Sequence, residues 1–185
     1  MFAAMEHVAH RTPEPSAEVR YWYHQGALAF SQHRYLVALD DEDKAISADP
    51  TFEPAYVVKG IALAYAYDDT YDAAMRILRK AVQMNPRDGY GWFNMGLCNE
   101  RYGFYSEGVA AYDHAIGLHQ RAWWLPWAYY GIACIYGREG NANLAVKYLK
   151  DALKYDPKAI LSAARSEEDF APIRDSSAFQ SVIDS

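Results

Sequence analysis

This chain of 185 residues lacks long hydrophobic runs and paired cysteines. No run of 18 apolar residues occurs, which argues against a membrane-spanning helix. The N-terminal stretch carries Glu6 and two histidines where a signal peptide would have its apolar core, so we expect a cytoplasmic protein. Cys98 and Cys134, the two cysteines, follow no metal-binding or redox spacing. We expect both to be buried thiols.

Basic clusters and catalytic signatures are also missing. The net charge is −6 and no patch of Lys and Arg matches a phosphate backbone, so we expect neither nucleic acid nor a membrane as a partner. There is no P-loop, dinucleotide-binding glycine motif or nucleophile elbow. His7 and His10 form H-x-x-H without a carboxylate at a diagnostic spacing, and the acidic run 40–43 is interpreted as a solvated helix face. The sequence therefore predicts a protein that is not an enzyme, with no catalytic residues, cofactor or metal.

What the chain has is a repeat. Gly26, Gly60 and Gly96 recur at intervals of 34 and 36, and Ala133 follows 37 residues later. Other small residues and prolines keep the same step: Ala38, Ala74, Gly108 and Ala145; Ala45, Ala81, Ala115 and Ala152; Pro50, Pro86 and Pro157. The chain therefore contains four similar units.

Each unit is predicted to be a pair of helices, because its apolar residues fall at i, i+3, i+4 and i+7. In the third unit the helices are expected at 89–102 and 105–118, joined at Gly103. The recurring small residues allow two helix axes to approach within the usual 8–10 Å. Large aromatic side chains one turn earlier are expected to fill the space beside that contact: Trp22, Tyr56, Trp92 and Tyr129.

The stretch "WFNMGLCNERYGFYSEGVAAYDHAI" and its counterparts in the other units resemble the tetratricopeptide repeat, with its period of about 34 residues and its Trp, Leu-Gly, Tyr, Ala, Phe, Pro order. The resemblance implies an all-α fold, a right-handed superhelical α-solenoid of helix-turn-helix repeats. It divides the chain into a weakly helical lead-in (1–17), four units spanning 18–157 (about 19–52, 53–88, 89–122 and 123–157) and C-terminal capping helices (158–185). The cap is expected because the last repeat of a solenoid otherwise leaves an apolar face uncovered.

Glu42 departs from the pattern, since such repeats usually carry Tyr, Phe or Leu at this position facing the core. An unpaired buried carboxylate is costly. We therefore expect Glu42 either to pair with Lys59 or Arg20, or to turn to solvent.

The concave wall of such a solenoid is built from the first helix of each unit. Helical spacing predicts an apolar and aromatic wall, interpreted either as packing between neighbouring first helices or as a peptide-binding groove. The candidate groove residues are Tyr23, His24, Phe30, Val57, Ile61, Tyr65, Tyr90, Phe93, Asn94, Leu97, Arg101, Trp127, Tyr130 and Arg138. Tetratricopeptide modules that hold a C-terminal carboxylate use Lys, Asn and Arg at five wall positions, which here are Tyr23, Ala27, Val58, Tyr90 and Asn94. A carboxylate clamp is therefore not expected.

The resulting hypothesis is a non-enzymatic adaptor, assembly factor or chaperone-like scaffold that binds an apolar or aromatic segment of a protein or peptide partner. The groove resembles in kind that of the small repeat chaperones of bacterial secretion systems. Two alternatives remain open. The chain could form a structural homo-oligomer through Trp123, Trp124 or the C-terminal cap, or it could be an accessory regulatory subunit of an enzyme complex.

Overall fold

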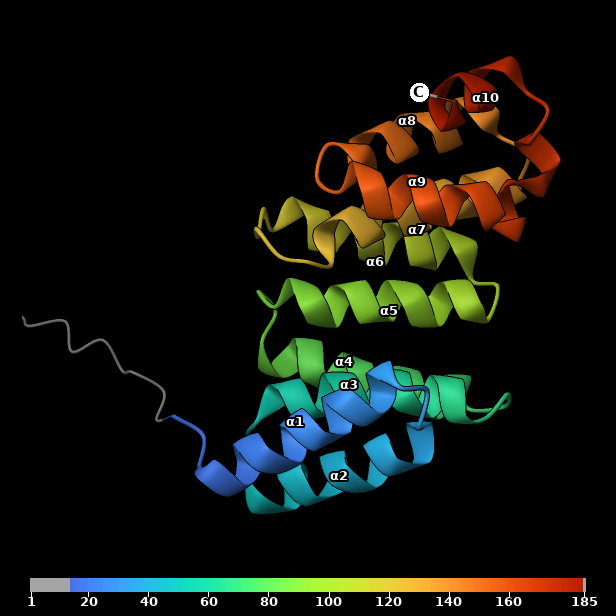
Figure 1. The fold of residues 1–185 in the computed structure, drawn as a ribbon. Helices are drawn as coiled ribbons and strands as arrows, with labels where there is room; N and C mark the ends of the chain where they lie inside the picture. The colour runs from blue at the N-terminus through green and yellow to red at the C-terminus, as the bar shows by residue number, and fades with distance from the viewer. Residues whose placement is uncertain (1–13, 185) are drawn as a thin grey trace, which may run out of the picture.

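The computed structural model describes residues 14–184, and this part of the chain contains helices and no strand. Four helical hairpins stack in chain order, followed by a helical tail (Figure 1). The hairpins are α1 (Ala17–Ser31) with α2 (Tyr35–Ala48), α3 (Glu53–Ala66) with α4 (Tyr71–Met84), α5 (Gly89–Arg101) with α6 (Tyr105–Gly117), and α7 (Leu125–Arg138) with α8 (Ala142–Leu153). The tail consists of α9 (Pro157–Ser166), the 3-10 helix η1 (Glu168–Ile173) and α10 (Ser177–Ile183). The expectation of an all-α solenoid is confirmed.

Local sequence signals set where the helices begin. The side chain of Ser16 accepts a hydrogen bond from the amide of Val19 at the start of α1, and Asp88 accepts from the amides of Tyr90 and Gly91 at the start of α5. These contacts satisfy amide groups that have no partner within the helix. Prolines, whose missing N–H is harmless in a first turn, occupy that turn in three helices: Pro54, Pro126 and Pro157.

Two glycines close the turns inside the later hairpins. Gly103 and Gly140 have φ angles of 80° and 75°, the left-handed region that glycine enters without strain. His33 holds the corresponding place in the first hairpin at a φ of 58°. The same backbone turn is therefore made in three hairpins, twice with glycine and once without it.

Inside each of the first three hairpins, a glycine of the first helix faces one side chain of the second. A Cβ atom on Gly60 would come within 2.7 Å of Leu78, and one on Gly96 would collide with the ring of Tyr112. Gly26 faces Glu42 in the same way. Bulk is excluded at these glycines because the partner side chain already fills the space.

Both alternatives for Glu42 are wrong. Its side chain is 0% exposed, and neither carboxylate oxygen has a hydrogen-bond partner among the described residues. Lys59 pairs with Asp43 instead, and Arg20 donates to a backbone carbonyl. The interpretation of the acidic run 40–43 as a solvated helix face is also only partly correct, because Asp41 is buried as well and pairs with Lys44. Burial raises the pKa of Glu42 to about 9, so this carboxyl is neutral at pH 7.

Two of the aromatic residues that lie one turn before the recurring small residues, Tyr56 and Trp92, also make hydrogen bonds. The hydroxyl of Tyr56 donates to the carbonyl of Pro50 at 2.9 Å, and the indole N–H of Trp92 donates to the carbonyl of Pro86 at 3.0 Å. In both units, an aromatic residue near the start of one hairpin thus bonds to the proline that follows the hairpin before it. This contact ties successive units together.

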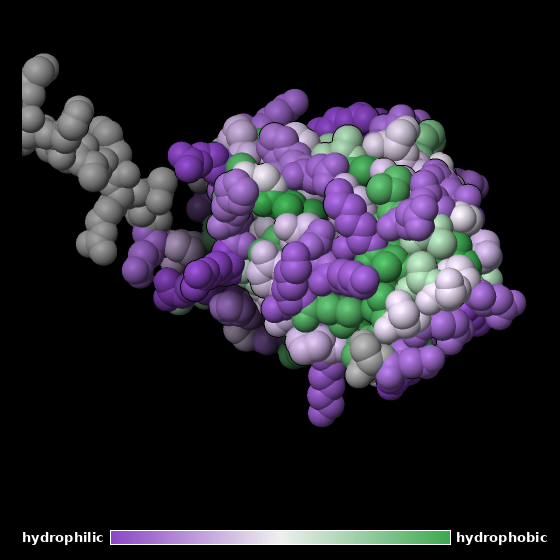
Figure 2. Space-filling view, turned by 90° about the horizontal axis from the view of Figure 1, so that it is seen from above, coloured by the Kyte–Doolittle hydropathy of each residue, from purple (hydrophilic) through white to green (hydrophobic). Residues whose placement is uncertain are grey.

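The tail packs on the last hairpin and continues its core. Phe170 and Phe179 are buried with their ring centroids 5.1 Å apart, and Phe170 meets Tyr130 of α7 edge to face. Gly137 leaves the room that Phe170 occupies. Seen from this end, the surface is mostly hydrophilic with smaller hydrophobic areas (Figure 2). The tail thus covers apolar surface of the last unit and gives the stack a polar end. Within residues 14–184, no helix combines the length and apolar character needed to cross a bilayer.

Candidate functional site

The first helices of the four hairpins form one continuous layer. α1 contacts α3, α3 contacts α5, and α5 contacts α7, whereas each second helix packs mainly on the first helix of its own unit and of the next. Because the first helices lie closer together than the second ones, the stack curves toward them. This layer is the concave inner wall on which the sequence predicts a groove.

An open cavity of about 500 Å³ lies on this wall, between α5, α7 and η1. Its lining comes from five elements and mixes aromatic with charged side chains. The lining residues are Tyr65 of α3; Phe93, Leu97, Glu100 and Arg101 of α5; Tyr112 of α6; Trp127, Tyr130, Gly131, Cys134 and Arg138 of α7; and Glu167 and Asp169 of the tail. The tail therefore forms part of the wall.

Half of the candidate groove residues meet at this cavity. Three come from α5, three from α7 and one from α3: Tyr65, Phe93, Leu97, Arg101, Trp127, Tyr130 and Arg138. Phe93 and Tyr130 present little surface, being 4% and 7% exposed. The half-buried side chains of Tyr65, Leu97 and Trp127 offer more contact area.

Three candidate groove residues do not face the groove. Val57 and Ile61 are 0% exposed and belong to the core of the second hairpin. Asn94 is buried, and its side-chain amide donates to the carbonyl of Tyr90 at 2.8 Å. The prediction is wrong for these three, because packing of α3 against α4 and α5 buries Val57 and Ile61, and Asn94 bonds within its own helix.

The remaining candidates lie outside the cavity, on α1 and in the first turn of α5. Tyr23 packs edge to face on Phe52, and Phe30 packs on Tyr65. Tyr90 is half-buried beside Phe93, and the side chain of His24 is exposed. The structure brings none of these four candidates, Tyr23, His24, Phe30 and Tyr90, to the lining of the cavity.

Glu100 forms the polar floor of the cavity. One of its carboxylate oxygens accepts a hydrogen bond from the hydroxyl of Tyr112 at 2.5 Å. Burial raises the pKa of Glu100 to about 7; the nearby carboxylates of Asp169 and Glu167 add to this rise, while the Tyr112 hydrogen bond and Arg138 oppose it. This carboxyl is therefore divided between its charged and neutral forms at neutral pH.

Both arginines at the cavity already have anionic partners. Arg138 forms an ion pair with Asp169 and donates to the hydroxyl of Tyr105. Arg101 lies 3.5 Å from the carboxylate of Asp68 and donates through Nε to a backbone carbonyl of α3. The charge of Arg138 is thus neutralised in place, whereas the contact of Arg101 with the 98% exposed Asp68 is a weak one.

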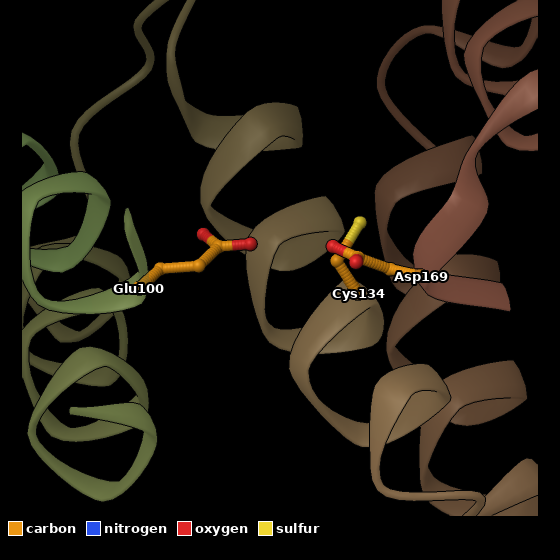
Figure 3. A group of neighbouring side chains, drawn as sticks. All are labelled: Glu100, Cys134 and Asp169. Carbon is orange, nitrogen blue, oxygen red and sulfur yellow. The ribbon is translucent and has the colours of Figure 1, made fainter. Parts of the chain in front are cut away.

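Glu100, Cys134 and Asp169 approach one another from three elements, as Figure 3 shows. Their side-chain oxygen and sulfur atoms lie within 4.8 Å of one another. Burial raises the pKa of the Cys134 thiol well above its usual value, and Asp169 is already paired with Arg138. A metal ion would need the thiolate form of the cysteine and a free carboxylate, so the group is poorly suited to one. His7 and His10, the other pair considered for a metal, lie outside the described residues.

The burial expected for the two thiols is confirmed. Cys98 of α5 is fully buried against the core of the second hairpin, and burial raises its pKa to about 11. Cys134 is also buried, although it borders the cavity.

Sequence reasoning missed the acidic lining of the cavity. Glu100 lies one turn after Leu97 and two turns after Phe93 on the same stripe of α5, so its position could have been deduced from helical spacing. Glu167 and Asp169 belong to the tail, whose sequence carries no repeat signal that would place it beside α7.

The two tryptophans considered for self-association differ in exposure. Trp124 is 3% exposed and stacks on Phe93, so the prediction is wrong for this residue. Trp123 is 68% exposed and borders a second open cavity together with Pro126 and Tyr155.

The chain matches known proteins along the repeats. The family model described as "Tetratricopeptide repeat" matches residues 60–88 and 128–159, which fall on the second and fourth hairpins. The solved structure of TTC0263, a thermophilic tetratricopeptide-repeat protein of Thermus thermophilus, superposes with a TM-score of 0.70 at 19% identity over 85% of this chain and 82% of that chain. The likeness to this structure shows the fold.

Two curated proteins show what such chains can be part of. Anaphase-promoting complex subunit 3 of Schizosaccharomyces pombe is 26% identical over 71% of this chain, and photosystem I assembly protein Ycf3 of Synechococcus sp. (strain CC9902) is 29% identical over 54%. The matches span 19% and 58% of those proteins' own lengths. By their names, one relative is a subunit of a complex and the other assists assembly.

Proposed function

We propose that this tetratricopeptide-repeat protein is a non-enzymatic interaction module that holds an apolar or aromatic segment of a protein partner in the cavity between α5, α7 and η1. The observation that carries the proposal is the cavity itself, which is open on the inner layer and lined by aromatic side chains from successive repeats. Large apolar side chains in a partly enclosed cavity are typical of sites where one protein anchors a segment of another. The names of the two curated relatives, one of a complex subunit and one of an assembly protein, support a role in assembly.

The half-buried rings define what the site accepts. Trp127 packs edge to face on Tyr130, and Tyr65 lies across the cavity on α3. Such rings contact an extended or helical segment along its apolar side chains. Affinity for a short segment is expected in the micromolar range, about −8 kcal/mol.

Truncating Trp127 should weaken this binding. Peptides would first be selected from a display library of random short segments on the wild-type protein, and their dissociation constants measured by fluorescence anisotropy. We expect the Trp127→Ala variant to bind them at least about tenfold more weakly, because the largest apolar lining side chain is lost. Equal affinity of the variant, or a library that yields no enriched segment, would contradict the proposal.

Trp123→Ala is the matched control for this experiment. It also truncates a tryptophan to alanine, at a position four residues earlier. The ring of Trp123 is 68% exposed and does not line the cavity. We expect its affinity for the selected peptides to equal that of the wild type. A loss in this variant instead would place the bound segment at the second cavity, which Trp123 and Trp127 both border.

Self-association is the second candidate function, and the exposure of Trp123 is the observation that favours it. An exposed tryptophan beside an open apolar cavity is a common feature of interfaces. If copies associate there, light scattering of the wild type should show a mass that rises with concentration, and the Trp123→Ser variant should stay monomeric. A wild type that is monomeric at every concentration would exclude this function.

A further inference from the structure

We propose that the cavity holds a cationic side chain, a lysine or arginine of the partner's bound segment, with its charged end against Glu100 and its aliphatic stem along Leu97 and Trp127. This inference rests on the proposed function and names the chemistry of the segment that the site takes. Geometry and charge support it independently.

The first argument is the charge of the lining. Three carboxylates and two guanidinium groups border the cavity, but Arg138 is paired with Asp169, and Arg101 with Asp68 outside it. Glu100 and Glu167 have no salt-bridge partner anywhere in residues 14–184. Two acidic groups are therefore left without a cation in a partly enclosed space.

The second argument is the way Glu100 is held. Tyr112 is fully buried and fixes one carboxylate oxygen of Glu100 with its hydroxyl, while the carboxylate reaches across the cavity toward α7 and η1 (Figure 3). A half-buried carboxylate oriented in this way is prepared to accept charge-assisted hydrogen bonds from an ammonium or guanidinium group.

The third argument is the match to the stem of a long cationic side chain. Lysine and arginine bury their methylene groups along apolar surface and place the charge at the far end. Leu97 and the ring of Trp127 supply such surface beside Glu100, and aromatic rings also attract cations. The net charge of −6 of the whole chain favours a basic partner over an acidic one.

An anionic occupant fits the cavity less well. A carboxylate of the partner would have to displace Asp169 from Arg138 or approach Arg101, and in either place it would lie beside Glu100 and Glu167. Like charges in a partly enclosed site repel strongly. The charge pattern therefore favours a cation.

The site should respond to pH through Glu100. The titratable and charged groups that face it are Tyr65 of α3, Arg101 of its own helix, Tyr112 of α6, Tyr130, Cys134 and Arg138 of α7, and Glu167 and Asp169 of the tail. Because the pKa of Glu100 is about 7 in the empty site, a cation has to bind the ionised form and displaces the proton. Affinity for a cationic segment should fall about tenfold between pH 8 and pH 6.

The test uses peptides selected on the wild-type protein, with each lysine or arginine replaced in turn by norleucine and by glutamate. We expect the selected peptides to share one cationic residue whose replacement by norleucine weakens binding about tenfold in EDTA-containing buffer. Glu100→Gln should remove this preference and its pH dependence, while the norleucine peptide binds the variant as it binds the wild type. Glu167→Gln should reduce the preference, and Glu139→Gln, on an exposed residue outside the cavity, should leave it unchanged.

Each contrary result has a distinct meaning. Selected peptides without a shared cation, a stronger glutamate peptide, or an unchanged preference in Glu100→Gln would overturn the cationic subsite while leaving the groove in place. A preference that appears only with added Zn²⁺ would overturn it in favour of a metal site at Glu100, Cys134 and Asp169. If no peptide is selected at all, the proposed function itself fails.

Discussion

Replacing Glu42 with leucine is expected to stabilise the protein by about 3 kcal/mol at pH 7. Glu42 stands where Leu78 and Tyr112 stand in the next two hairpins, facing the glycine of its own first helix. Its pKa is about 9 in the folded chain, against 4.5 in the unfolded chain, so folding at pH 7 requires the carboxyl to take up a proton. That uptake accounts for about 3 kcal/mol. Leucine removes this requirement and the two unsatisfied oxygens.

The sign of the pH dependence follows from the direction of the shift. Between pH 4.5 and 9 the folded chain binds more protons at Glu42 than the unfolded chain does, so the stability of the wild type falls as pH rises. The gain from Glu42→Leu should therefore be larger at pH 8.5 than at pH 5. Some pH dependence of the same sign will remain, because burial also raises the pKa of Glu53 to about 8.

Urea denaturation at pH 5 and pH 8.5 measures this effect. Glu42→Gln is the matched control: it removes the titration but keeps an unsatisfied polar group, so it should lose the same pH dependence and gain less stability than Glu42→Leu. A Glu42→Leu variant that is less stable than the wild type at both pH values would show that the carboxyl has a partner and is not buried unpaired.

The second large effect is expected at the Tyr112 ring, which lies between Gly96 of α5 and Gly131 of α7. Tyr112 is fully buried, and Cβ atoms on either glycine would collide with it. Tyr112→Ala should destabilise the protein by about 4 kcal/mol, since a large ring is lost from a closely packed site. Gly96→Ala should destabilise it by about 2 kcal/mol, although alanine is the better helix former.

The two changes should not be additive. With Tyr112→Ala in place, the ring that excludes a methyl group is gone, and Gly96→Ala should become stabilising by about 1 kcal/mol through helix propensity alone. Thermal and urea unfolding of the two single variants and the double variant measure this reversal of sign. Gly117→Ala, at the last residue of α6 with no atom near the missing Cβ, is the control and should give the same small gain from helix propensity in both backgrounds. If the losses of stability of the two single variants add in the double variant, the Tyr112 ring is not what excludes a larger residue at position 96.

The period of small residues was enough to predict the solenoid because the same close contact between two helices recurs in successive hairpins and leaves no room for a larger side chain. Gly60 and Gly96 each admit one side chain of the partner helix, and the helices predicted for the third unit at 89–102 and 105–118 lie at 89–101 and 105–117. Spacing along a helix predicts which face a residue is on. That information is local, and the hairpin is a local structure.

The wall was predicted less well because helical spacing does not tell which neighbour covers a face. Val57 and Ile61 lie on the inner face of α3, but packing within the second hairpin and against α5 buries them. Leu97 and Trp127 share the same kind of position and stay accessible where α5 and α7 border the cavity. The acidic side of the cavity depends on the fold of the tail, which no repeat describes. Glu42 was misjudged because both alternatives avoided a buried unpaired carboxyl, and the structure contains one.

The most direct test of the account is to locate a bound peptide on the protein. A selected peptide carrying a paramagnetic label would be added to the ¹⁵N-labelled protein, and the broadening of amide signals recorded. The account predicts broadening at the residues of α5, α7 and η1 that border the cavity, with α2 and α4 unaffected, and its loss in the Trp127→Ala variant. Broadening centred on α2, α4 or the surface around Trp123 would contradict it.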